Sequence, residues 1–454
     1  MTARDVRKTA LAILSALEKN RPATLDRLLD EDRNANRERP RRDRAFLQAL
    51  VFGVLRSRNR LDWFIRHFSK TPFRKIAPDV RNILRLGIYQ ILHMDRVPDS
   101  AAVNTSVELA KSVVAPWTVK FVNGLLRSVT RNRADVKLPA ITQDPIQALS
   151  VRKSLPKWIV RRWLARFGQE ACTQLCDAIN TIPPLSLRTN TLITSRPVLV
   201  EALSESAENP TPTSHAPEGI LLAGLKTELP AIPAFVQGKF QVQDEAAQLV
   251  SHILAPCSGQ RILDACAGLG GKTGHIGQLI ENKGEIVALE SVGSKLTTLQ
   301  QEMRRLGISI VKPASHDLTR PPDPATFGTF DRVLLDAPCS GLGVLRRNPD
   351  ARWHRTAADL KRYARRQQLF LNHLAPLVKP GGLLVYAVCS MEPEENEQVV
   401  HRFLSDNRSF AQADIQPNAI ADPQSVIGPD RCLRTFPHRH NTDGFFAVCL
   451  ERRR

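Results

Sequence analysis

The spacing of hydrophobic residues changes character twice along the chain. Residues 1–135 carry apolar positions at helical intervals, as Val6, Leu14 and Leu17 illustrate, and lack the β-branched alternation of strands. The same helical pattern returns in four further stretches, several opened by Ser or Pro: 43–56, 78–94, 100–114 and 116–129. The pattern predicts an all-α first domain, residues 1–137.

A short mixed region follows this bundle. Residues 137–156 contain three prolines and no long periodic segment, which is typical of a linker. Two helical patterns then meet at Gly168, and residues 185–193 alternate as a strand. We therefore expect a small α+β module over 145–240.

From Arg261 onward, strand-like and helix-like segments alternate. The expected strands cover 261–264, 285–290, 308–317, 330–338 and 381–390. Such alternation predicts a doubly wound parallel sheet, so residues 241–454 are expected to form a Rossmann-like domain. A last strand at 444–452 follows a loop and is compatible with an antiparallel edge.

Charge is concentrated in the first domain. The 454-residue chain has a formal net charge of +19, and residues 1–137 hold 28 Lys and Arg against 14 Asp and Glu. This excess favours an anionic partner, most simply nucleic acid. A solvated surface that only aids solubility is the alternative. Between the first two predicted helices, the basic run 33–44 is expected to be an exposed loop.

Eight cysteines are present, without any C-x-x-C pair or zinc-finger spacing, so no metal is predicted. This usage fits a reducing compartment, and we expect a cytoplasmic protein. Its apolar runs are too short to cross a membrane. The N-terminal run closes with Glu18 and Lys19 without a cleavage site, which favours a helix over a signal peptide.

A glycine-rich loop follows the strand at 261–264. Gly268, Gly270 and Gly271 permit a sharp bend and close approach of a ligand before a helix that begins near Thr273. A strand, glycine loop and helix often open a cofactor-binding sheet. By itself, the loop is equally compatible with a structural turn.

Acidic residues follow four successive strands: Asp264, Glu290, Asp317 and Asp336. In an open α/β sheet these strand ends border the ligand crevice. An acid after the second strand can bind ribose hydroxyls, and one after the third can bind an adenine amino group. Helix capping is the alternative for each of them.

Cys339 and Cys389 lie at equivalent positions after later strands, and each is followed by Ser. A cleft thiol near basic groups can ionise and act as a nucleophile, although burial as a structural residue is common. A cysteine protease would require a paired histidine. His316 and His354 are candidates, but nothing in the sequence pairs them with a thiol.

Methylation of cytosine at carbon 5 requires all of these parts. A thiolate must add to carbon 6, an acid must face ring nitrogen 3, and an adenosyl cofactor must lie beside them. The motifs DACAGLGGKT, DAPCSGLGVLRRNPD and YAVCSMEPEENE resemble those of RNA cytosine-5 methyltransferases. The helical N-terminus is similar to the NusB-like domain that marks the RsmB (Sun/Fmu) family.

This resemblance implies a role for each matched residue. S-adenosylmethionine would be the methyl donor, with Glu290 on its ribose and Asp317 on its adenine. Asp336 would be the acid facing cytosine, Cys389 the nucleophile, and Cys339 the residue that assists product release. The loop would hold the methionine end of the cofactor through Cys266, Ala267, Gly268, Leu269, Gly270, Gly271 and Lys272, the last of which also lines the catalytic site.

The resemblance also implies a substrate. The family methylates small-subunit ribosomal RNA, at cytosine 967 of 16S rRNA. We expect a monomer that acts on this rRNA or on a pre-ribosomal particle. Two alternatives stay open: a methyltransferase of tRNA or large-subunit rRNA, and a non-catalytic RNA-binding factor.

Two positions depart from the family pattern. The loop reads CAGLGGKT where the family usually has CAAPGGKT, so Gly268 and Leu269 make it less rigid in the unfolded ensemble. Glu290 stands where aspartate is more frequent, and its longer side chain can still reach two hydroxyls.

A basic segment follows the first cysteine motif. Residues 344–366 contain eight Lys and Arg, with Trp353 and Tyr363 among them. Such a segment can bind phosphates and stack on an unpaired or flipped base. An amphipathic helix whose aromatic residues face the core is the alternative.

Overall fold

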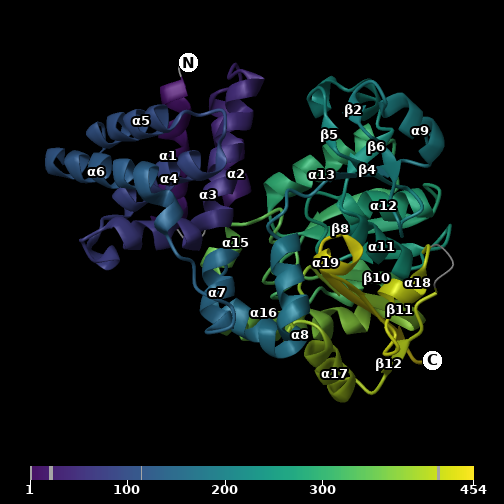
Figure 1. The fold of residues 1–454 in the computed structure, drawn as a ribbon. Helices are drawn as coiled ribbons and strands as arrows, with labels where there is room; N and C mark the ends of the chain where they lie inside the picture. The colour runs from purple at the N-terminus through teal and green to yellow at the C-terminus, as the bar shows by residue number, and fades with distance from the viewer. Residues whose placement is uncertain (1–2, 20–23, 114, 417–419) are drawn as a thin grey trace. The chain divides into compact units, whose positions relative to one another are not determined.

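The computed structural model describes residues 3–19, 24–113, 115–416 and 420–454 (Figure 1). Two compact units make up the chain. Unit 1 comprises residues 1–181 and 345–355, and unit 2 comprises 182–344 and 356–454. The chain therefore leaves unit 2 after the Cys339 motif, contributes eleven residues to unit 1 and returns. Val114, the last residue of one predicted helix, lies outside the described part.

Helices build unit 1, as the sequence predicts. Its longer helices are α1 (Ala3–Lys19), α2 (Leu25–Ala35), α3 (Arg41–Phe68), α4 (Pro78–His93), α5 (Asp99–Lys111), α6 (Pro116–Asn132), α7 (Pro145–Arg152) and α8 (Lys157–Ala178). Figure 1 shows α4, α5 and α6 packed alongside one another. Val6, Leu14 and Leu17 of α1 lie in the shared core, at most 3% exposed.

Two local expectations in unit 1 have different outcomes. The predicted break at Gly168 is confirmed, because this residue has φ +76° inside α8. The expected exposed loop over 33–44 is correct only in part: most of these residues are exposed, but the connection itself covers only residues 36–40. Helices α2 and α3 occupy its ends, and Arg39 between them is buried against Asp32. Helix α2 contains many polar residues, such as Asp30 and Arg33, so the helical spacing of its few apolar residues is weak in the sequence.

Part of the predicted basic track belongs to the core of unit 1. Arg352 is fully buried and donates hydrogen bonds to Asn180 Oδ1 at 2.7 Å and Ser154 O at 3.3 Å. Trp353 packs against the helical core, and its indole N–H donates to Leu55 O at 2.9 Å. Of the two interpretations of Trp353, the structure supports core packing, and Arg352 is unavailable to phosphates.

Unit 2 begins with a small α+β module. Its antiparallel sheet has the order β3-β4-β1-β6, with β1 (Leu185–Thr189) in the interior, paired to β4 (Gly219–Leu222) and β6 (Phe240–Val242). The remaining elements are β2 (Ala207–Glu208), β3 (Thr211–Pro212), β5 (Gly224–Leu225), α9 (Arg196–Leu203) and α10 (Pro233–Val236). This arrangement agrees with the predicted α+β character.

The large sheet of unit 2 is mixed, with the order β12-β14-β11-β10-β7-β8-β9 and β13 paired to β14. Its strands are β7 (Arg261–Asp264), β8 (Glu285–Glu290), β9 (Val311–Ser315), β10 (Phe330–Asp336), β11 (Val378–Val388), β12 (Phe410–Ala413), β13 (Cys432–Thr435) and β14 (Phe445–Arg452). Strands β7 to β11 pair in parallel, and β14 runs antiparallel to β11. The predicted antiparallel direction of the last strand is confirmed, but its predicted place at the sheet edge is wrong, because β12 and β13 also pair with β14.

Helices cover both faces of this sheet. Alternate strand residues such as Leu335 and Tyr386 pack under α16 (Ala357–Leu374) and α17 (Glu397–Asp406). The intervening residues pack against α11 (Glu245–Ile253) and α12 (Gly271–Leu279) on the opposite face. The remaining α-helices of unit 2 are α13 (Gly293–Arg305), α14 (Pro324–Phe327), α18 (Pro423–Val426) and α19 (Pro437–His440), whereas α15 (Ala351–His354) belongs to unit 1. The result is a three-layer α/β/α domain of Rossmann type.

The strand order reverses beside β7. The chain runs outward from β7 to β8 and β9, then crosses back so that β10 pairs with the other side of β7. Such a switch point leaves a crevice at the carboxyl ends of the strands. All four predicted acids and both predicted cysteines follow these ends.

Candidate functional site

A cavity of about 490 Å³ lies at the carboxyl ends of the parallel strands. Its wall includes residues that follow β7, β8, β9, β10 and β11: Cys266, Gly268, Glu290, Asp317, Asp336, Cys339 and Cys389. The structure thus brings most of the predicted site residues together. Ala267, Leu269, Gly270, Gly271 and Lys272 are not part of the wall, although they belong to the same loop.

The glycine-rich loop is shaped by two left-handed residues. Gly268 has φ +56° and Gly270 has φ +88°. A Cβ at Gly270 would lie 2.9 Å from Leu299 Cγ, whereas a Cβ at Gly268 would meet nothing within 4 Å. Gly270 is therefore required for packing, and Gly268 leaves the cavity open. Leu269 is 55% exposed and points away from the core.

Glu290 and Asp317 form the acidic side of the cavity. The Glu290 carboxylate accepts the Val292 N–H at 3.0 Å and lies 3.5 Å from Lys295 Nζ. Asp317 accepts the Thr319 N–H at 2.9 Å, and this backbone hydrogen bond lowers the pKa of Asp317. Both carboxylates take part in local turns while lining the cavity, so the capping alternative and a ligand role are compatible.

Lys272 and Asp336 connect the loop to the cysteines. Lys272 Nζ lies 2.6 Å from Asp336 Oδ2. Burial by itself lowers the pKa of Lys272, but Asp336 and, to a lesser degree, Cys389 raise it above its ordinary value. The ammonium group therefore stays charged. A fixed positive charge here stabilises negative charge on Asp336 and on the Cys389 sulfur.

The two thiols face each other. Cys339 Sγ and Cys389 Sγ are 3.2 Å apart. Its hydrogen bond with Cys389, together with burial, raises the pKa of the Cys339 thiol well above its ordinary range. Cys339 therefore keeps its proton. Either sulfur can be the donor in this contact.

The two histidines considered for a protease are occupied elsewhere. His316 Nε2 shares a hydrogen bond with Arg320 O at 3.0 Å, and His354 Nε2 shares one with Leu17 O at 3.0 Å within unit 1. A thiol–imidazole pair built on either residue is therefore not supported.

Glu395 joins the two cysteine loops, and sequence reasoning gave it no role. Its carboxylate accepts the Ser340 N–H at 2.7 Å, the Ser340 hydroxyl at 2.5 Å and the Ser390 hydroxyl at 2.6 Å. Gln367 Nε2 donates to it at 3.2 Å. Glu395 is fully buried, and burial raises its pKa. The serine after each cysteine was the signal that could have revealed this bridge.

Asp264, the acid that ends β7, lies beneath the loop. It is 1% exposed and accepts the Thr273 hydroxyl at 2.7 Å. Burial raises the pKa of Asp264 to about 6, and the Asp336 charge acts in the same direction. Asp264 therefore supports the start of α12 instead of lining the cavity.

Within the described ranges, no helix has both the length and the apolar character needed to cross a membrane.

Three family models match successive parts of the chain. The 16S rRNA methyltransferase RsmB/F model matches residues 251–451, and the NusB family model matches residues 4–131. The model for the ferredoxin-like domain of RsmF/B-like methyltransferases matches residues 155–226.

Full-length relatives give the same picture. The probable ribosomal RNA small subunit methyltransferase B of Synechocystis is 39% identical over 90% of this chain and 91% of its own. The protein of the same name from Bacillus subtilis is 34% identical over 99% of each chain. The solved structure of PH0851 has a TM-score of 0.82 and 25% identity, covering 100% of this chain and 99% of that one.

The buried Asp264 predicts a pH-dependent stability. Unfolded aspartate ionises near pH ~3.9, whereas folded Asp264 holds its proton until about pH 6. As pH rises between these values, the unfolded state loses its proton first, so the unfolding free energy falls. Relative to Asp264→Asn, wild-type protein should lose about 3 kcal/mol over this window. Urea unfolding at a series of pH values measures it, and parallel curves for both proteins would contradict the assignment.

The Glu395 bridge predicts a large cost for its removal. Glu395→Ala leaves buried donors of Ser340, Ser390 and Gln367 without their acceptor, so we expect a loss of about 3 kcal/mol of unfolding free energy. Chemical denaturation measures this loss. The neighbouring Glu394→Ala, a partly exposed position, is the matched control. Equal effects of the two substitutions would contradict the bridging role.

Proposed function

The chain belongs to the 16S rRNA methyltransferase RsmB/F family, and from this premise we propose that it methylates carbon 5 of a cytosine in small-subunit rRNA. The observation that carries the proposal is the pair of thiols 3.2 Å apart in a cavity that also holds Glu290 and Asp317. One wall suits an adenosyl cofactor, and the opposite wall suits nucleophilic attack on a base.

S-adenosylmethionine fits the residues present. Its sulfonium is positive, and the cavity wall carries the carboxylates of Glu290, Asp317 and Asp336. Gly268 leaves open space where a side chain would otherwise project. Glu290 would bind the ribose hydroxyls, Asp317 the adenine amino group, and the loop from Cys266 to Lys272 the methionine end. When bound, this cofactor supplies an electrophilic methyl group.

The residues on the opposite wall would activate the base. Cys389 adds as a thiolate to carbon 6, and Asp336 delivers a proton to ring nitrogen 3, so that carbon 5 becomes nucleophilic. Lys272, 2.6 Å from Asp336, stabilises the carboxylate that Asp336 becomes once it has given up this proton, and it supports the thiolate electrostatically. After methyl transfer, a water molecule takes the proton from carbon 5, and the electron pair of that bond expels Cys389 from carbon 6 as a thiolate. Ring nitrogen 3 returns its proton to Asp336, and the aromatic ring is restored.

Cys339 would assist that last step. Because its thiol keeps its proton, it can donate a hydrogen bond to the departing Cys389 sulfur at 3.2 Å. A leaving thiolate that accepts a hydrogen bond is more stable than one facing an apolar wall.

The names of the relatives favour small-subunit rRNA over tRNA or large-subunit rRNA. We propose cytosine 967, the family target, as the methylated base. Both thiols and all four acids are present, which weighs against a non-catalytic RNA-binding factor. Bisulfite sequencing of rRNA from a deletion strain tests the site directly, since loss of protection at that cytosine alone is the expected result.

A groove between α16 and α17 offers a path for RNA outside the cavity. It has a volume of about 530 Å³ and is lined by Lys361, Arg365 and Arg402, with Glu394 on the same wall. The three basic side chains are exposed. Although Arg352 is buried, Lys361 and Arg365 of the predicted basic track are exposed on this groove and are available to phosphates.

The two cysteines have distinguishable predicted phenotypes. Cys389→Ala should abolish transfer of a radiolabelled methyl group to unmodified rRNA, because no thiolate can add to carbon 6. Cys339→Ala should instead accumulate a protein–RNA adduct that survives denaturing gel electrophoresis. The exposed Cys257→Ala is the control and should behave as wild type. An adduct with Cys389→Ala would reverse the roles.

The groove predicts a change in salt dependence. Single-stranded RNA binding loses about 0.7 in the log–log salt slope for each phosphate contact removed. The double substitution of Lys361 and Arg365 to Ala should therefore reduce the slope by about 1.4, as measured by RNA titration at several salt concentrations. Lys283 and Lys312, exposed near the opposite strand ends, provide the control double substitution. An unchanged slope in the groove variant would contradict this path.

A further inference from the structure

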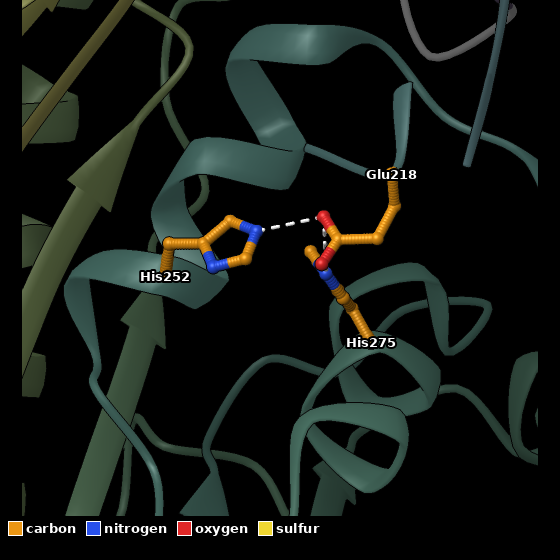
Figure 2. A group of neighbouring side chains, drawn as sticks. All are labelled: Glu218, His252 and His275. Carbon is orange, nitrogen blue, oxygen red and sulfur yellow. Dashed lines mark hydrogen bonds and ion pairs between the residues drawn. The ribbon is translucent and has the colours of Figure 1, made fainter. Parts of the chain in front are cut away.

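Three potential metal ligands meet inside unit 2, away from the cofactor cavity. Glu218 immediately precedes β4, His252 lies on α11 and His275 lies on α12. Figure 2 shows both imidazole rings directed toward the Glu218 carboxylate. His252 Nε2 lies 2.9 Å and His275 Nε2 3.7 Å from Glu218 Oε2, and one ligand atom from each residue falls within 4.8 Å of the others.

His275 is the unusual member of this group. It is fully buried, and neither of its ring nitrogens has a hydrogen-bond partner. An unpaired buried imidazole is costly, because both nitrogens lose water without compensation. A buried imidazole directed at a carboxylate and close to a second imidazole is a metal-ligand arrangement.

The spacing suits a tetrahedral ion. Zn²⁺ binds histidine nitrogen and carboxylate oxygen at about 2.0–2.2 Å, so tetrahedral ligand atoms lie about 3.3 Å apart. The observed separations of 2.9 and 3.7 Å lie on either side of that value. Two histidines and a glutamate are also a ligand set found in zinc enzymes, where water completes the tetrahedron.

The charges around the group limit how tightly it can hold a cation. Arg188 is the nearby positive charge, and it acts on both His275 and Glu218. Its guanidinium is held by Gly271 O at 2.7 Å and by the side-chain oxygens of Gln241, Gln243 and Gln278. Because the site has a single carboxylate and lies near Arg188, we expect it to bind zinc less tightly than a structural site with four protein ligands.

We propose that Glu218, His252 and His275 bind one Zn²⁺ as a structural ion, with water as the fourth ligand. The ion would connect three segments of unit 2: the start of β4 in the small module, α11, and α12, which begins at the glycine-rich loop. It would therefore fix the small module to the helix that carries this loop. The proposal is independent of the reaction proposed above.

Zinc content and zinc coordination test the site. The full-length protein is dialysed against buffered Zn²⁺ without RNA or cofactor, and bound zinc is measured by mass spectrometry. We expect one equivalent per chain and X-ray absorption showing nitrogen and oxygen neighbours at about 2.0–2.1 Å. Sulfur neighbours at about 2.3 Å would instead identify the thiol pair as the ligand, and that result would overturn the proposal.

Substitutions locate the ion. His275→Gln and His252→Gln should each weaken zinc binding at least tenfold and abolish the rise in melting temperature that Zn²⁺ gives the wild type. The exposed His401→Gln is the matched control and should retain both effects. Circular dichroism checks that each variant is folded. If a variant unfolds, X-ray absorption on the wild-type protein still identifies the type of ligand atoms around the zinc. Absence of bound zinc, or equal loss in the control, would overturn the site.

Discussion

The buried carboxylate of Glu395 holds the candidate catalytic site together. It accepts hydrogen bonds from the serine after Cys339 and from the serine after Cys389, so two loops from different strands share one anchor. In the parallel register of β10 and β11, Asp336 lies opposite Ala387, so the two loops leave the sheet side by side at its carboxyl edge. Strand pairing sets the approach of the loops, and Glu395 fixes their final positions. The 3.2 Å separation of the sulfurs depends on both.

Much of the fold could be predicted because its evidence is local. Apolar spacing distinguishes the helical bundle from the α/β domain, and the alternation of strands and helices implies a parallel sheet with its ligands at one edge. This reasoning correctly gathered Glu290, Asp317, Asp336 and both thiols around one cavity. The carboxyl ends of parallel strands lie at one edge of the sheet, so the residues that follow these strands lie at that edge as well.

The residues that sequence reasoning missed are connected only through tertiary structure. Arg352 looks like part of a basic surface, but its segment is buried among carbonyl and amide oxygens of distant residues in unit 1. Glu218, His252 and His275 are spaced at 34 and 23 residues, which matches no metal-binding motif, and they meet only because β4, α11 and α12 pack together. Long-range packing leaves no periodic signal in the chain.

Helix α12 explains why the glycine-rich loop tolerates Gly268 and Leu269. Three side chains along the helix are anchored in different directions: Lys272 on Asp336, Thr273 on Asp264 and Gln278 on Thr189 O. The loop is short and leads directly into this helix, so its position follows from the anchored helix more than from its own stiffness. Gly268, at φ +56°, also adopts a conformation that costs a glycine little and an alanine more. Leu269 in place of the family's proline therefore increases the freedom of the unfolded chain, while the side chains anchored along α12 hold the end of the folded loop.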